Sequence, residues 1–108
     1  MFARSQYIKN YLISILVELK DENYIRGLPK KDFCERVAHY MAELNIIHPF
    51  REGNGRTIRE FIRCLGARCG YTIHWDRVDK DTILQASILS VTNPAELAKC
   101  IEACIEKE

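Results

Sequence analysis

Apolar side chains recur along most of this chain at the spacing of amphipathic helices. In the first segment they are separated by three or four residues, which places them on one side of a helix. These positions are Ile8, Tyr11, Leu12, Ile15, Leu16 and Leu19. Ser5 precedes them as a candidate N-cap, and residues 23–29, which end in Pro29, supply a stop. The pattern therefore predicts a first helix between these two signals.

Four further segments repeat the helical spacing. The second segment has apolar positions at Phe33, Val37, Tyr40, Met41 and Leu44, and the third has them at Ile58, Phe61, Ile62 and Leu65. We expect the third helix to end near Gly70, because glycine readily takes the left-handed backbone that follows a helix. Residues 82–90 and 95–105 are the last two, and Asn93 followed by Pro94 is a typical start for the final helix.

Evidence for a strand is confined to residues 71–75, a stretch too short and isolated to build a sheet. We therefore predict an all-α fold, a compact helical bundle in which the loop over residues 45–55 joins the two central helices. Aromatic and sulfur side chains on such faces are usually core, so the pattern alone assigns no chemistry to Tyr40, Met41 or Trp75.

Length and composition limit the classes of function that the chain can have. The chain has 108 residues, 47% of them hydrophobic, which predicts one domain spanning residues 1–108. A formal charge of +1 excludes the strongly basic surface of a non-specific nucleic-acid binder. No apolar run is long enough for a membrane span, and the first residues do not resemble a signal peptide. We expect a soluble, cytoplasmic protein.

The five cysteines are odd in number and include no Cys-x-x-Cys pair, which indicates a reduced compartment. Cys100 and Cys104 are one helical turn apart and could hold a metal or oxidise. Their spacing more often places two small apolar side chains against a core.

The loop between the two central helices combines several features of a phosphate site. Gly53 and Gly55 flank Asn54, so consecutive backbone N–H groups can turn inward as an anion-binding nest where the next helix begins. Arg56 and Arg59 are three residues apart and share one helical face, where two guanidinium groups can hold the oxygens of a polyphosphate. The five arginines of residues 51–70 face only two glutamates, so the near-neutral total conceals one basic region.

Two further residues of this loop carry chemistry. Glu52 offers the hard carboxylate oxygen that Mg²⁺ prefers when it also binds substrate phosphates. His48 can accept a proton near neutral pH, as a general base acting on a hydroxyl group would. Each feature alone has an ordinary explanation: a turn, a structural histidine, or arginines on a solvated helix surface pairing with Glu60. The segment is neither a P-loop nor a dinucleotide-binding fingerprint.

Residues 48–59 resemble the signature of Fic domains, His-x-Phe-x-(Asp/Glu)-Gly-Asn-Gly-Arg-x-x-Arg, at every defined position. The resemblance extends through residues 33–38 and 44–47 before the loop, and through residues 60–63 and 70–71 after it. It implies transfer of AMP from ATP to a hydroxyl side chain of a target protein. In that reaction His48 would be the general base and Glu52 would hold Mg²⁺, while Phe50 would anchor the loop.

The resemblance also assigns the phosphate contacts. Gly53, Asn54 and Gly55 would form the anion hole, and Arg56 and Arg59 would engage the β- and γ-phosphates of the departing pyrophosphate. Many Fic domains carry a β-hairpin flap before the region that resembles residues 2–12, and we expect this chain to lack it.

Many Fic proteins also carry an inhibitory helix with the motif (Ser/Thr)-x-x-x-Glu-(Gly/Asn), which this sequence does not contain. If the chain is complete, its inhibitor would be a small antitoxin-like partner. If the chain is a fragment, the helix would belong to the missing part.

Three alternatives remain at this point. The same fold could use another donor, such as UTP for UMP transfer, a phosphocholine donor or a phosphate donor, although Gly55, Arg56 and Arg59 favour a nucleoside triphosphate. The domain could bind nucleotide or a partner without transferring a group. A nucleic-acid surface formed by Arg51, Arg56, Arg63 and Arg68 is disfavoured, because only Phe50 and Phe61 interleave with them, at expected core positions.

Overall fold

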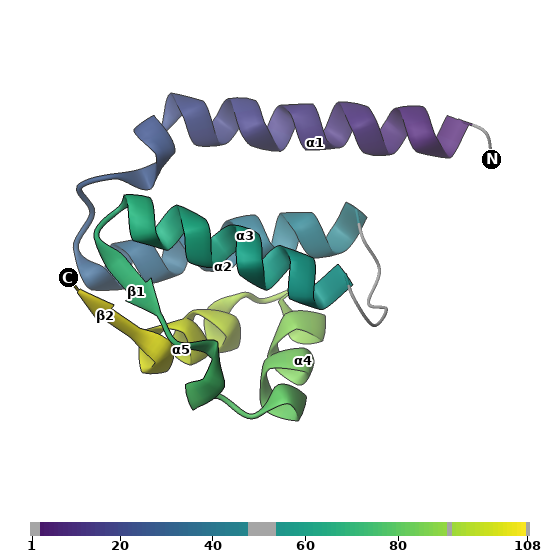
Figure 1. The fold of residues 1–108 in the computed structure, drawn as a ribbon. Coiled ribbons are helices and arrows are strands. Elements are labelled where there is room, and N and C mark those ends of the chain that lie inside the picture. Colours follow the sequence, from purple (N-terminus) through teal and green to yellow (C-terminus); the bar gives the residue numbers. More distant parts are fainter. Residues whose placement is uncertain (1–2, 48–53, 91, 108) are drawn as a thin grey trace.

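The computed structural model describes residues 3–47, 54–90 and 92–107, and within these residues the chain is mostly helical (Figure 1). The helices are α1 (Ala3–Asp21), α2 (Lys30–Ile47), α3 (Asn54–Arg68), α4 (Lys80–Leu89) and α5 (Ala95–Cys104). Two short turns, η1 (Asn23–Ile25) and η2 (Trp75–Arg77), and two strands, β1 (Tyr71–Ile73) and β2 (Ile105–Lys107), complete the described elements. The predicted all-α bundle is confirmed.

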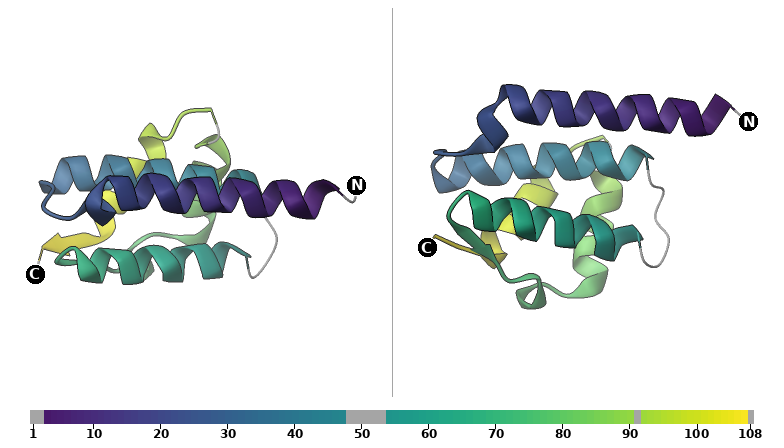
Figure 2. Two further views of the ribbon diagram at one scale, coloured as in Figure 1. Left: turned by 90° about the horizontal axis from the view of Figure 1, so that it is seen from above. Right: turned by 45° about the horizontal axis from the view of Figure 1, so that its top comes forward.

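Helix α2 lies at the centre of the bundle and packs against α1, α3, α4 and α5. Its inward side chains are almost completely buried, and they meet the apolar face of α5. The central buried residues are Phe33, Val37, Tyr40, Met41, Leu97, Ile101 and Cys104. Helix α1 runs along the outside of α2, and α4 and α5 lie on the other side of α2 from α1 (Figures 1 and 2). The periodicity that predicted α2 therefore also identified its buried face, whereas Leu16, placed on the apolar side of α1 by the same spacing, is 45% exposed.

An unusual turn and a group of polar contacts join α1 to α2. Asn23, Tyr24 and Ile25 all have positive φ, between 53° and 58°, although none is glycine. Beside this turn a polar cluster links the end of α1 to α2; its members are Glu18, Glu22, Arg36, His39 and Tyr40. These interactions link the end of α1 to α2. They lie beside residues 23–29, where the sequence predicted that the first helix stops.

The prediction that residues 71–75 could not build a sheet was wrong. Strand β1 pairs antiparallel with β2, and Thr72 lies opposite Glu106. Helix α5 ends at Cys104, one residue before its predicted end, and the chain continues directly as β2. A three-residue strand that follows a helix without a turn residue has no periodicity of its own, which explains why the sequence pattern extended the helix instead.

Several helix boundaries and faces also differ from the predictions. Helix α1 begins at Ala3, so Ser5 is not its cap. The side chain of Asn93 accepts a hydrogen bond from the Ala95 backbone N–H at 3.0 Å, but α5 begins at Ala95 with Pro94 at its N-cap position, so Pro94 is not the first helical residue as predicted. Phe61, predicted to be core, is 40% exposed. In the described ranges, no helix has the length and apolar character needed to cross a membrane.

Candidate functional site

The beginning of α3 carries four of the predicted phosphate-binding residues. Asn54 and Gly55 are the first two residues of this 15-residue helix, and Arg56 and Arg59 follow within its first two turns. Because the first turn of a helix has backbone N–H groups without helical partners, and these form the positive end of the helix dipole, this end attracts anions. The first turn of α3 contains no acidic side chain that would pair with these N–H groups.

Arg56 and Arg59 differ from the next arginine of the same helix. Arg63 binds Glu60 through two hydrogen bonds, of 3.0 Å and 2.5 Å, and this contact lowers the pKa of the Glu60 carboxyl. Arg56 is exposed and Arg59 is partly buried. Neither guanidinium group has a carboxylate within 4.0 Å among residues 3–47, 54–90 and 92–107. Two cationic groups without such a carboxylate therefore stand beside the positive end of α3.

Helix α3 is held in place by its apolar face and by the segment that follows it. Ile58, Ile62 and Leu65 are buried against the core. The Trp75 indole N–H donates a hydrogen bond of 3.0 Å to the backbone carbonyl of Arg59. The sequence had assigned no role to Trp75, because a side chain that bonds a backbone carbonyl sixteen residues away leaves no pattern in the sequence.

His48, Phe50, Glu52 and Gly53 lie outside the described residues. Helix α2 ends at Ile47 and α3 begins at Asn54, so both flanking ends are described, and Figure 1 shows them at the same end of the bundle. The predicted base and metal ligand therefore belong to the connection between the C-terminal end of α2 and the N-terminal end of α3.

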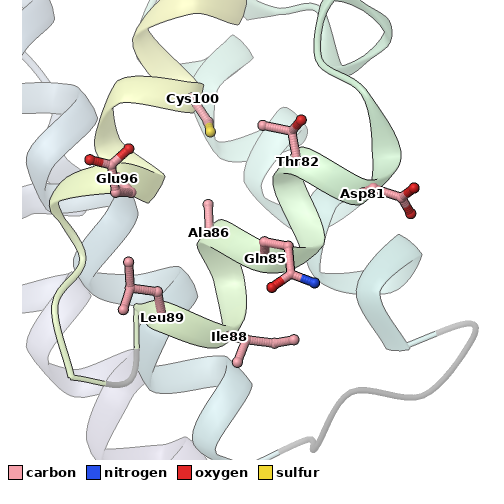
Figure 3. A pocket seen from close by; sticks show the side chains of 8 residues that line it. All are labelled: Asp81, Thr82, Gln85, Ala86, Ile88, Leu89, Glu96 and Cys100. Carbon is pink, nitrogen blue, oxygen red and sulfur yellow. The ribbon is translucent and has the colours of Figure 1, made fainter.

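A pocket of about 610 Å³ lies between α4 and α5 (Figure 3). It is lined by Asp81, Thr82, Gln85, Ala86, Ile88, Leu89, Glu96 and Cys100. This lining includes none of the residues predicted to bind phosphate, and its two charged members are acidic. The pocket and the positive end of α3 are therefore different surfaces. Within the described residues, no group of three His, Cys, Asp or Glu side chains is arranged to hold a metal ion.

The family model of the Fic/DOC family matches residues 1–65. The protein adenylyltransferase VbhT from Bartonella schoenbuchensis is 44% identical over 100 residues. That match covers 93% of this chain and 21% of VbhT, so the chain spans about a fifth of the length of this relative.

Solved structures show the same fold. The N-terminal Fic domain of a VirB-translocated Bep effector protein from Bartonella quintana, with bound ADP, has a TM-score of 0.88 and 31% identity. That match covers 94% of this chain and 48% of the other. BepC from Bartonella tribocorum, with bound AMPPNP, has a TM-score of 0.85 and 29% identity over 94% of this chain and 49% of the other.

Proposed function

Because the chain belongs to the Fic/DOC family, we propose that it transfers AMP from ATP to a Ser, Thr or Tyr hydroxyl of a target protein. VbhT is named a protein adenylyltransferase, and two structural relatives were solved with ADP and with AMPPNP, an analogue of ATP. The observation that carries the proposal is the start of α3, where Arg56 and Arg59 stand beside the positive end of a helix.

In the proposed reaction, the phosphates of ATP lie on Gly53, Asn54 and Gly55, and Arg56 and Arg59 hold the β- and γ-phosphates. The target hydroxyl oxygen attacks the α-phosphorus. The bond from this phosphorus to the oxygen that bridges to the β-phosphate breaks, and pyrophosphate leaves with that oxygen. His48 accepts the hydroxyl proton. The arginines stabilise the charge that develops on the leaving group, which is the main source of catalysis in phosphoryl-transfer sites.

We propose Mg²⁺ as the metal of this site, held by Glu52. The donor set fits, because Glu52 supplies a hard carboxylate oxygen two residues before α3 begins, and Mg²⁺ commonly takes one or two carboxylates together with substrate phosphates. When bound, the ion would neutralise phosphate charge.

We also propose the domain extent, the location and the partners of the protein. The 108 residues would form one Fic-like core, and the protein would act in the cytoplasm. Its partners would be ATP and a hydroxyl-bearing target protein, with a small antitoxin-like inhibitor if the chain is the whole protein and an inhibitory helix in the missing part if it is a fragment. A donor other than ATP is the second candidate, and a comparison of UTP and ATP as donors distinguishes it.

Labelling of proteins in a lysate with ATP that carries a tag on the α-phosphate tests the proposal. We predict that His48→Ala lowers labelling by at least about a hundredfold, since general-base catalysis contributes about that much. ATP binding should be retained, because His48 acts on the hydroxyl group rather than on the phosphates.

His39→Ala is the matched control, since it removes the same ring from a partly buried histidine that contacts Glu18 on the far side of α2 from α5. The His39→Ala variant should label proteins in the lysate at the rate of the unmodified protein. Labelling by His48→Ala at the rate of the unmodified protein would contradict the assignment of the base. Labelling that excess untagged UTP suppresses more strongly than excess untagged ATP would contradict ATP as the donor.

A further inference from the structure

Trp75 links the segment after α3 to the half of α3 that carries the predicted phosphate contacts. Its indole N–H lies 3.0 Å from the carbonyl oxygen of Arg59, and its ring packs against the hydrophobic core. We propose that Trp75 is a positioning residue that fixes the start of α3 for binding of the β- and γ-phosphates. This inference rests on the proposed function, because it assumes that Arg59 contacts ATP.

The segment 71–75 is attached to α3 at two separate points. Near the end of the helix, Gly66 is packed so closely that an added Cβ would lie 3.0 Å from the Ile73 side chain and 3.3 Å from the Tyr71 carbonyl oxygen. Nearer the beginning, Trp75 bonds to Arg59. Seven residues of helix separate the two points, roughly 10 Å along the axis.

Two attachments restrain a helix in a way that one cannot. The buried side chains of Ile58 and Ile62 hold one face of α3 against the core. The Gly66 contact, however, is near the end of the helix and leaves the first turns without a polar restraint from the segment that follows α3. The Trp75 hydrogen bond holds the peptide group of Arg59 itself, so it restrains both the guanidinium-bearing residue and the N–H groups of the turns before it. Binding of a polyphosphate requires several donors to be aligned at once, and small displacements weaken all of them together.

Tyr71 provides a matched control within the same segment. Its hydroxyl donates a hydrogen bond of 2.6 Å to the Leu28 backbone carbonyl, away from α3. Trp75→Phe and Tyr71→Phe therefore each remove one side-chain donor to a backbone carbonyl and keep an aromatic ring. Only the first substitution removes a contact to α3.

The first experiment measures the affinity of the chain and of both variants for ATP and for AMP in the presence of Mg²⁺. Trp75→Phe should weaken ATP binding about three- to tenfold, the range expected for one hydrogen bond. AMP binding should change less than about twofold, since AMP lacks the β- and γ-phosphates. Tyr71→Phe should leave the ratio of the two affinities unchanged, because a purely structural loss does not distinguish AMP from ATP.

A double-mutant cycle tests whether Trp75 acts through Arg59. In the Arg59→Ala background, Trp75→Phe should produce a smaller loss of ATP affinity than in the unmodified chain, because the part of its effect that acts through the guanidinium group is removed. If Trp75→Phe fails to fold, replacing Trp75 with benzothienylalanine keeps the ring shape and removes only the N–H group.

The outcomes separate this inference from the proposed function. A chain that binds ATP, but in which Trp75→Phe behaves like Tyr71→Phe, overturns the positioning role and leaves the proposed function standing. Additive losses in the cycle overturn the route through Arg59. A chain that binds neither nucleotide overturns the proposed function and the positioning role together.

Discussion

At the scale of single residues, the junction between α1 and α2 depends on the charge of one carboxylate. Glu22 accepts a hydrogen bond of 2.8 Å from Arg36 Nε and another from the Tyr40 hydroxyl. The Arg36 hydrogen bond lowers the pKa of Glu22 below its ordinary value of 4.5. Because the pKa is lower in the folded chain than in the unfolded chain, the ionised carboxylate stabilises the fold above pH 4.5, and this contribution is lost as the pH falls through the lowered pKa.

We therefore predict that Glu22→Gln lowers the free energy of unfolding by about 1–2 kcal/mol at neutral pH, and by less at an acidic pH below the lowered pKa, where Glu22 in the unmodified chain is itself protonated. Urea denaturation at the two pH values measures this. Glu60→Gln is the control, since the Glu60–Arg63 pair is exposed and screened by solvent, so its loss should change the stability less than the loss of Glu22 does. An equal loss for Glu22→Gln at both pH values would contradict the role of its charge.

The cysteines should differ in reactivity according to their burial. Cys34 and Cys104 are buried, and desolvation raises the pKa of each thiol to about 11, whereas Cys64 is exposed. At about pH 8 roughly one in a thousand molecules would carry either buried thiol as the reactive thiolate. We predict that iodoacetamide modifies Cys64 well before Cys34 or Cys104, as measured by mass spectrometry of peptides. Denaturant should remove the difference, and equal rates in the folded chain would contradict the described burial.

At the scale of elements, two glycines of the α3–β1 connection serve different purposes. Gly70 has a φ of +84°, and an added Cβ would meet no atom within 4 Å, so only its backbone conformation requires glycine. Gly66 lies within α3, and an added Cβ would be close to the buried Ile73 and to a backbone carbonyl. The first glycine therefore ends the helix, and the second allows β1 to approach it.

We predict that Gly70→Ala destabilises the chain by about 1–2 kcal/mol. Gly66→Ala gains about 1 kcal/mol of helix propensity, and we predict that crowding against Ile73 and the Tyr71 carbonyl outweighs this gain, so that the variant is also less stable. A second substitution in urea denaturation experiments distinguishes them. Ile73→Val shortens the side chain nearest the new methyl group, so it should reduce the loss caused by Gly66→Ala and leave the loss caused by Gly70→Ala unchanged. A Gly66→Ala variant as stable as the original chain would show that β1 can move away from α3.

The elements also show what a sequence can and cannot predict. Apolar spacing identified the helices, and Gly70 was correctly expected in the left-handed region, because both signals are local. Strand β2 was missed because its pairing with β1 joins residues more than thirty positions apart. Phe61 was assigned to the core because it shares the apolar spacing of its helix. That spacing does not fix where the buried face of a helix ends, so a residue at the edge of the face can be exposed. Pairing of Glu60 with Arg59 or Arg63 was considered as an ordinary alternative, and the structure shows it for Arg63, whereas the bond from Trp75 to Arg59 was not considered.

At the scale of the whole molecule, the net charge of +1 conceals a basic region at the start of α3. The folded chain brings Arg56, Arg59 and the helix N-terminus together, and the unfolded chain does not. A polyphosphate should therefore bind only the folded chain and stabilise it according to its concentration relative to Kd. At a hundredfold excess over Kd this amounts to about 2.7 kcal/mol, or an increase in Tm of roughly 10 °C for a domain of this size.

We accordingly predict that ATP with Mg²⁺ raises Tm more than AMP does at the same concentration, and that inorganic tripolyphosphate reproduces part of the increase. Added salt should reduce the effect of tripolyphosphate more than that of ATP, because salt screens exposed charge and ATP also gains contacts through its base. Replacing both Arg56 and Arg59 with Ala should abolish the tripolyphosphate effect. Arg63→Ala is the control on the same helix and should preserve it, since Arg63 already binds Glu60. An unchanged tripolyphosphate effect in the double variant would place the phosphate contacts elsewhere on the molecule.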